Sequence, residues 1–335
     1  MLSAHSEKVV AAGTTCEIER LNKILVRNSE KARLIRELKS SSLTELESVP
    51  CAKIQQVPNS VFIPRLPSKA SAMSTQWTRT NLFSNVKPGT EKYLYEHILE
   101  SRNDYEISMT GRQLNMHDND VYLHVIRLAQ EQSAGQFIFF KRSEFLRALG
   151  KYDSDREYKD LLQSLKKLKS ATIFIGKGKK GEGFNLIDDI SWDNEKGYWF
   201  TLGSNLINQF KIAPKKGVTL NAKLNPKKPL AGAEIDGISF IDLNARLKIK
   251  KPMAKWLQNY MSGHKQGSHR ITAQTLMRLS GSIGRLNDFV RRGLPGALEE
   301  LKAVGLINSY AIEKNKEGVV VASWDRVAHP KSRTK

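Results

Sequence analysis

This 335-residue sequence is poor in long apolar runs, in cysteine and in acidic residues. No apolar segment approaches the roughly 18 residues that a membrane-spanning helix needs, and the N-terminal segment lacks the apolar core of a signal peptide. The two cysteines, Cys16 and Cys51, lie far apart in a polar region without metal-ligand spacing, so we expect ordinary reduced thiols. We therefore predict a cytoplasmic protein that does not associate with membranes.

Motifs of catalysis are absent as well. The glycine-rich segment Gly176–Gly183 lacks the G-x-x-x-x-G-K-[ST] pattern of a phosphate-binding P-loop, and it lies in a predicted hairpin and not before a helix. No His-x-His pair precedes a candidate tyrosine nucleophile, and His264 and His269 lie in a basic loop without acidic partners. Carboxylates are scarce where positive charge is densest, which disfavours a two-metal nuclease or polymerase site. We predict no enzymatic activity, no metal site and no cofactor.

One acidic segment leaves two interpretations open. His117, Asp118, Asn119 and Asp120 are consecutive, and their carboxylates could bind a divalent metal. Alternatively, Asp118 or Asn119 caps a helix over Val121–Gln130, whose positive end the acids favour. The sequence has no matching second cluster of histidines or acids, which favours the cap.

Positive charge is what the chain has in excess, with a net charge of +20. Between Arg246 and Arg292 there are eleven lysines or arginines against one acid, Asp288, which is a local net charge of +10. Clustering of this kind indicates a polyanionic partner, whereas basicity that serves only solubility would not cluster. The segment Lys211–Lys228 adds six lysines and no acid. It is either an exposed loop that touches phosphates or a solvated insertion.

The same basic segment is patterned as a folded unit. Pro252, Thr272 and Arg285 mark the starts of three predicted helices, and Gly305 ends the third. Two apolar runs separated by the turn Glu313–Gly318 predict a hairpin. Helix, helix, turn, helix and two-stranded wing is the order of the winged helix-turn-helix, whose last helix lies in the DNA major groove.

An order of the same kind recurs upstream. Phe137–Phe140 predicts a short strand, Ser143 caps a short helix, and Ser154-x-x-Glu157 is a capping box that opens an amphipathic helix. The apolar runs on either side of Gly176–Gly183 then predict a wing with a basic tip. The fold class we predict is therefore α+β, with two tandem winged helix-turn-helix domains and a flexible, partly helical N-terminal arm.

The predicted organisation divides the chain into five parts: the N-terminal arm and proline-containing linker 1–76, the first winged-helix domain 77–210, the basic loop and connector 211–245, the second winged-helix domain 246–326 and the basic tail 327–335. Apolar residues between Ile18 and Leu38 recur at helical spacing. This arm is either solvated and partly disordered or a helix for association with a partner or with itself.

With both units placed, the chain resembles plasmid replication initiators of the TrfA type, from about Arg79 to Ile307. Five segments in order carry the resemblance: Thr78–Phe83, Thr110–Ala129, Phe137–Gly150, Phe240–His264 and Leu298–Ile307. The resemblance implies a protein that binds direct repeats (iterons) at a plasmid origin, helps open adjacent AT-rich DNA, and recruits the host initiator, replicative helicase and sliding clamp. In related initiators the first winged helix can dimerise, and monomers are active at the origin.

One departure from that family concerns the sliding clamp. TrfA-like proteins carry a clamp-binding peptide of the Gln-Leu-x-Leu-Phe kind before the first domain. The comparable segment here, Gln55–Phe62, has a different spacing and an inserted Pro58. Phe62 is the candidate clamp contact in this departing motif. The first 50 residues have no clear counterpart in the family.

The predicted DNA-binding residues are Arg156, Lys159, Lys166, Lys167, Lys177, Lys179, Lys180, Arg270, Arg285, Asn287, Arg291 and Arg292. Arg285 and Asn287, near the start of their helix, are best placed for base edges, because arginine pairs with guanine and asparagine with adenine. Pro295 predicts a bend or a short break in that helix. The sequence leaves three alternatives to an initiator open. These are a winged-helix transcriptional regulator, an RNA-binding or scaffolding protein and, least favoured, an enzyme.

Overall fold

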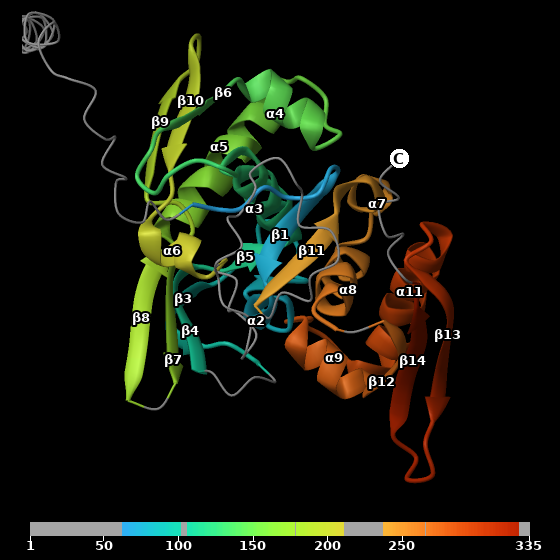
Figure 1. Cartoon of the computed structure of the whole chain (residues 1–335). Helices are drawn as coiled ribbons and strands as arrows, with labels where there is room; N and C mark the ends of the chain where they lie inside the picture. Colours follow the sequence, from blue (N-terminus) through green and yellow to red (C-terminus); the bar gives the residue numbers. More distant parts are fainter. Residues whose placement is uncertain (1–61, 102–105, 178, 211–236, 265, 328–335) are drawn as a thin grey trace, which may run out of the picture. The chain divides into compact units, whose positions relative to one another are not determined.

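Our computed structural model describes residues 62–101, 106–177, 179–210, 237–264 and 266–327. All of these residues belong to one unit, Asn59–Lys335 (Figure 1). The predicted N-terminal helices, both cysteines and the basic loop Lys211–Lys228 lie outside the described residues.

The first half of the unit is built around the helix α3 (Met116–Leu128). The Asn115 side chain accepts hydrogen bonds from the backbone N–H groups of His117 and Asp118, and the Asp118 carboxylate accepts one from the N–H of Asn115. This reciprocal pair is a capping box. Asp118 therefore takes part in the cap, as predicted, but from inside the first turn. The predicted start of the helix at Val121 is wrong: the N-cap is Asn115, whose side-chain oxygen accepts from the free N–H groups of an earlier first turn.

α5 (Asp155–Ser170) packs on α3, and α4 (Arg142–Ala148) and β9 (Asp189–Asp193) pack on α5. Two further strands, β6 (Ile138–Phe140) and β10 (Gly197–Thr201), lie in the same sheet as β9. The strands form an antiparallel sheet in the order β6-β10-β9. The rings of Phe140, Tyr198 and Phe200 are buried and pack together beside Phe145 of α4. As predicted, Ser154 caps α5.

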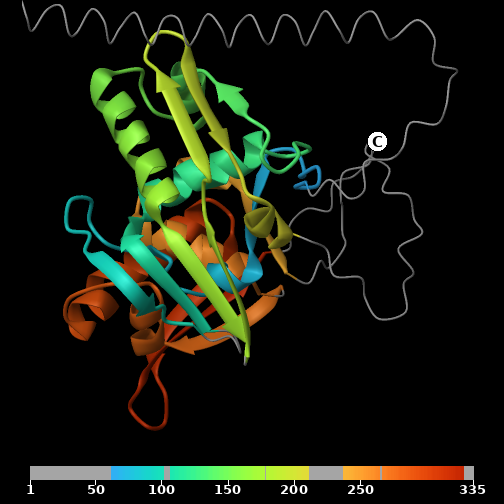
Figure 2. The ribbon, with the colours of Figure 1, turned by 90° about the vertical axis from the view of Figure 1, so that its left-hand side faces the viewer.

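The glycine-rich hairpin forms, but it belongs to a different sheet. β7 (Thr172–Lys177) and β8 (Lys180–Asn185) pair with each other and then with β4 (Glu106–Arg112) and β3 (Tyr93–Ile98), in the order β3-β4-β7-β8. These strands lie side by side in Figure 2, and Figure 1 shows β7–β8 and β9–β10 at opposite ends of the left-hand side. The hairpin that pairs with β6 is β9–β10. The prediction that Gly176–Gly183 is the tip of the first wing is therefore wrong, because alternation of apolar residues does not specify the strand that pairs.

The second half contains the predicted helices and hairpin together with one further strand: α8 (Pro252–Ser262), β12 (Gly267–Thr272), α9 (Ala273–Leu279), α10 (Leu286–Asp288), η1 (Phe289–Gly293), α11 (Leu294–Ala303), β13 (Ile307–Lys314) and β14 (Val320–Arg326). Pro252 lies in the first turn of α8, and Thr272 caps α9, as predicted. Gly305 follows α11 with a φ of +75°, which confirms its role in ending the helix. The strand β12 was not predicted; it extends the hairpin to a sheet in the order β12-β14-β13.

α10, η1 and α11 follow one another without a break, with a π-helical turn in the middle. Pro295 has no N–H to donate to the Arg291 carbonyl, so an α-helical ladder cannot run through this point. The turn η1 widens the backbone just before it. As a result the buried side chains step five positions, from Phe289 to Leu294. In an uninterrupted α-helix Arg292, three residues after Phe289, would share the buried face, whereas here it is exposed.

One pair of strands from distant parts of the sequence joins the two halves: β1 (Ala70–Ser74) pairs antiparallel with β11 (Ile238–Asp242). Within the first half, β2 (Phe83–Ser84) pairs in parallel with β5 (Leu114–Asn115). Three short helices complete the described chain: α2 (Thr75–Thr78), α6 (Ser204–Asn208) and α7 (Leu243–Lys248). One cluster of buried apolar side chains runs through both halves. Among the described residues, none of the helices has the length and apolarity to cross a bilayer.

Candidate nucleic-acid interface

The exposed face of α5 carries a stripe of cations. Arg156, Lys159, Gln163 and Lys166 recur at spacings of three and four residues and are all exposed. The ammonium of Lys166 lies 4.5 Å from the ring centroid of the exposed Trp192 in β9, a cation–π contact. Three of the predicted DNA-binding residues therefore face solvent on one line. Gln163 lies in the same line and can bond to adenine edges, although it was not among the predicted contacts.

Lys167, the fourth predicted cation of this helix, points into the protein. Its ammonium donates to Glu91 Oε1 at 2.8 Å and to Asp118 Oδ2 at 3.1 Å, and the side chains of both acids are almost wholly buried. Ser164 donates to the second oxygen of Asp118 at 2.7 Å. The prediction that Lys167 binds DNA is therefore wrong. One residue along a helix is a rotation of about 100°, which moves Lys167 from the face of Lys166 to the buried side.

We expect Glu91 to make stability depend on pH in the acid range. Burial alone would raise the pKa of Glu91, but the hydrogen bond and charge of Lys167, with a bond from Asn115, lower this pKa from 4.5 to about 2. A carboxyl group with a lowered pKa contributes stability that is complete above pH 4.5 and is lost as the pH falls toward about 2. The free energy of unfolding in urea should therefore fall less steeply over that range in Glu91→Gln than in the wild type. Equal slopes would contradict this role for Glu91.

The helix of the second half also presents its predicted contacts to solvent. Arg285 immediately precedes α10, and Arg285, Asn287, Arg291 and Arg292 are all exposed. Arg270 is exposed on the strand β12, which immediately precedes α9. The structure thus exposes all five residues, four at the start and along one helix and one on β12. The π-helical turn is the local feature that leaves Arg292 on this surface.

Lysines at two hairpin turns complete the set of surface cations. Lys179 and Lys180 are exposed at the end of β7–β8, away from the sheet that contains β6; the side chain of Lys177 lies outside the described residues. Lys314 and Lys316 are exposed at the turn of β13–β14 and were missed as contacts. Their signal was present in the sequence, since the predicted turn Glu313–Gly318 contains both lysines.

Two cations of the basic segment are not available to a ligand. Arg246 is 3% exposed, and its Nε donates to Asp120 Oδ1 at 2.7 Å while its Nη2 donates to Asn119 Oδ1 at 2.6 Å. Lys255 donates to the other Asp120 oxygen at 2.5 Å. Burial alone would raise the pKa of Asp120, but Arg246 and Lys255 lower it. Only some cations of the basic segment are therefore free to contact a ligand, because two of them form ion pairs with Asp120 inside the fold.

His264 is largely buried, whereas Phe62, the candidate clamp contact, is exposed. His264 Nδ1 lies 2.7 Å from the carbonyl oxygen of Tyr260, and its ring lies 5.2 Å from that of His269. Burial lowers the pKa of His264 to about 4, so this imidazole is neutral at pH 7 and does not attract phosphate. Phe62 is 47% exposed and forms an isolated β-bridge with Ser133. Its contact with a clamp stays a prediction.

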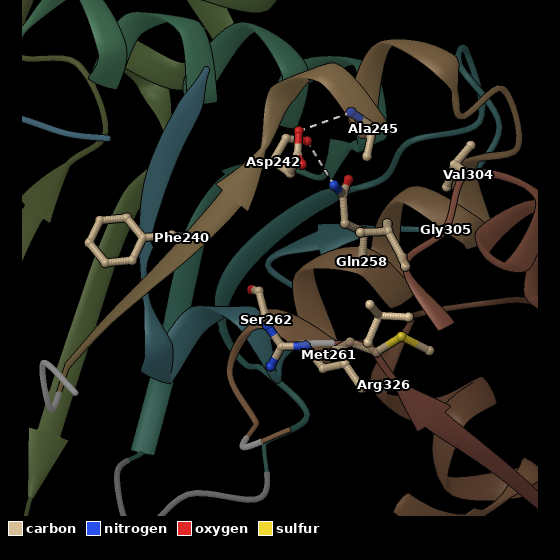
Figure 3. A pocket seen from close by; sticks show the side chains of 11 residues that line it. Phe240, Asp242, Ala245, Gln258, Met261, Ser262, Val304, Gly305 and Arg326 are labelled. Carbon is tan, nitrogen blue, oxygen red and sulfur yellow. Dashed lines mark hydrogen bonds between the residues drawn. The ribbon is translucent and has the colours of Figure 1, made fainter. Parts of the chain in front are cut away.

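A cavity of about 100 Å³ lies between β11, α7, α8 and the end of α11 (Figure 3). Its polar groups are bonded within the protein. Asp242 accepts from the N–H of Ala245, and its carbonyl oxygen accepts from Gln258 at 2.9 Å. Arg326 donates to the carbonyl oxygen of His264. Because the side chains of Asp242 and Arg326 both make hydrogen bonds that stabilise the fold, they do not present an acid–base pair to a ligand in the cavity. The exposed cations therefore remain the stronger candidate site.

No protein-family model matches the chain, and no curated protein matches it. Two crystal structures of domains 2 and 3 of RctB are similar in structure. One is 12% identical with a TM-score of 0.48, covering 75% of this chain and 97% of that one. The other is 12% identical with a TM-score of 0.45, covering 74% and 95%. Likenesses this remote carry no argument about function.

Proposed function

We propose that this chain is a sequence-specific double-stranded DNA-binding protein with two tandem winged helix-turn-helix domains. The observation that carries the proposal is a repeated feature, a helix with exposed cations that follows a shorter helix and a turn. In the first half this helix is α5, with Arg156, Lys159 and Lys166. In the second half it is the continuous helix of α10, η1 and α11, with Arg285 and Arg291 among its cations. A rod with cations along its exposed face fits the major groove.

Strand order supports the assignment of both halves to one fold. In the second half the sheet order β12-β14-β13 places the strand before α9 next to the last strand of the hairpin. In the first half the order β6-β10-β9 is the same, with the hairpin β7–β8 inserted between α5 and β9. Recurrence of one topology in two halves of different sequence favours a duplicated DNA-binding architecture over two unrelated ones.

The proposed contacts divide between base edges and phosphates. Arg285 and Asn287, at the start of their helix, suit guanine and adenine edges. Arg291 and Arg292 lie farther along, within reach of bases or phosphates. The exposed lysines of the β13–β14 and β7–β8 turns would contact phosphates, which position the protein without specifying sequence.

We further propose that the duplex bound is a set of origin repeats and that binding initiates plasmid replication. The resemblance of five sequence segments to TrfA-type initiators supports this, and it implies opening of AT-rich DNA and recruitment of the host initiator, replicative helicase and sliding clamp. A monomer–dimer equilibrium is proposed on the same basis. The exposed apolar side chains of β3 and β7, which include Tyr93, Ile98 and Phe174, support self-association through that sheet.

Arg285→Ala is expected to weaken sequence preference at one position. If Arg285 bonds to a guanine, its loss should reduce discrimination at that base pair by about 1–3 kcal/mol and leave discrimination elsewhere unchanged. The measurement is a titration of the selected duplex and its single-base variants. Lys316→Ala is the matched control, since loss of a phosphate contact should weaken binding to all duplexes alike. The same uniform loss in Arg285→Ala would make Arg285 a phosphate contact instead.

Footprinting over the DNA that flanks its own gene tests the proposed function. Protected repeats at helical-turn spacing, together with strand opening in adjacent AT-rich DNA, are expected of an initiator. Protection of an operator without strand opening would favour the transcriptional regulator. Tighter binding to matched RNA than to the duplex would contradict DNA as the partner.

A further inference from the structure

The turn that precedes the second DNA-contacting helix is held by a loop from the first half. Asn85, which follows β2, donates its backbone N–H to the carbonyl oxygen of Ser280 at 2.7 Å. The side-chain amide of Asn85 donates to the hydroxyl of Ser282 at 2.8 Å. The hydroxyls of Ser280 and Ser282 lie 2.7 Å apart, and Ser280 is wholly buried. We call Asn85, Ser280 and Ser282 the clasp.

Close backbone approach accompanies these bonds. Gly281, between the two serines, has a φ of +64°, which favours glycine. A Cβ added there would lie 2.9 Å from the Ser84 hydroxyl and 3.0 Å from its Cβ. Glycine is therefore required for the chain reversal and for the contact with the first half. The turn is packed against the other half of the protein and is not a free connection.

A series of bonds continues from the clasp to the first DNA-contacting helix. Ser84, the neighbour of Asn85, pairs with Asn115 where β2 meets β5. The Asn115 amide donates to Glu91 at 2.8 Å, and Glu91 accepts from Lys167 of α5 at 2.8 Å. Both DNA-contacting helices are thus attached to the same short strand pair. A rotation of one helix against the other would have to strain or break these bonds.

We propose that Asn85 is a positioning residue that sets the distance and rotation between the two DNA-contacting helices, so that the chain accepts two subsites at one spacing. This inference rests on the proposed function. One inserted base pair moves the second subsite by about 3.4 Å and turns it by about 35° around the duplex. A chain with a fixed pair of helices cannot follow that change without losing contacts, whereas a loosened chain can.

The test uses the full chain and a duplex that it selects from random sequences. Affinity is measured for that duplex, for each subsite alone, and with one or two base pairs inserted between the subsites. We expect Asn85→Ala and Ser282→Ala to lose about threefold to tenfold of the wild-type preference for the native spacing, the value of one hydrogen bond. Their affinities for single subsites should match the wild type. Asn308→Ala is the matched control, since its 2.8 Å bond to Asp325 lies within the second half.

A distance measurement without DNA separates this inference from the proposed function. Nitroxides are placed by Lys159→Cys and Lys302→Cys, both exposed, in a chain with Cys16→Ser and Cys51→Ser. Pulsed electron resonance should give a narrow distance distribution, and Asn85→Ala should broaden it. Unchanged spacing preference or an unchanged distribution in folded Asn85→Ala would overturn the inference. If the wild type selects no duplex, the proposed function fails, and the distances still decide whether the clasp fixes the helices.

Discussion

Replacing Asp120 by alanine is expected to lower the free energy of unfolding by about 3–5 kcal/mol. Asp120 is the carboxylate partner of Arg246, whose side chain is 3% exposed. Removing the acid leaves this cation buried and without its counter-charge. Lys255, which pairs with the same acid, has a partly exposed side chain and can turn toward water. Most of the cost therefore comes from Arg246.

Denaturant titration at neutral pH measures this loss, and two other variants define its cause. Asp120→Asn keeps a hydrogen-bond acceptor but removes the charge, so it should fall between the wild type and alanine. Glu100→Ala breaks an ion pair with Arg278 in which both side chains are well exposed, and it should cost no more than about 1 kcal/mol. If Asp120→Ala costs as little as Glu100→Ala, the buried guanidinium does not depend on Asp120.

DNA affinity is expected to fall roughly 10³–10⁵-fold between about 50 and 200 mM salt, if about 6–10 phosphates are neutralised. Seven of the predicted cations are exposed on the two helices and β12: Arg156, Lys159, Lys166, Arg270, Arg285, Arg291 and Arg292. The hairpin lysines supply further contacts. Each contact releases counterions, so the logarithm of affinity should decrease linearly with the logarithm of salt concentration. Affinity measured across this range gives the slope.

Two adjacent lysines provide the matched pair for this experiment. Lys166→Gln should reduce the magnitude of the salt slope by about 1, because its ammonium is exposed. Lys167→Gln should leave the slope unchanged and instead lower stability, because its ammonium pairs with Glu91 and Asp118. A reduced slope in folded Lys167→Gln would contradict the buried position. A slope near zero in the wild type would contradict phosphate binding itself.

Helices were the part of the fold that the sequence predicted best. Pro252, Ser154 and Thr272 act within one turn of their own positions, so the physical cause of each helix start is local. Gly305 ends its helix for the same kind of reason. Strand pairing was predicted poorly. The segment Thr172–Ile175 was correctly predicted to be a strand, but its partner β4 lies far away in the sequence. Packing in the folded protein selects this partner, and the residues of Thr172–Ile175 alone do not identify it.

Helices with one cationic and one apolar face, and an excess of positive charge, could be predicted from the sequence without the structure. These properties depend on residue type and on neighbours within a turn or two. Which charges remain at the surface became clear from the structure alone: Lys166 is exposed and Lys167 is buried, and Arg246 forms a buried ion pair with Asp120. The physical reason is that burial and pairing depend on residues from other segments, which periodicity along one segment cannot identify. The clasp of Asn85 on the turn at Ser280 is such a contact between distant segments.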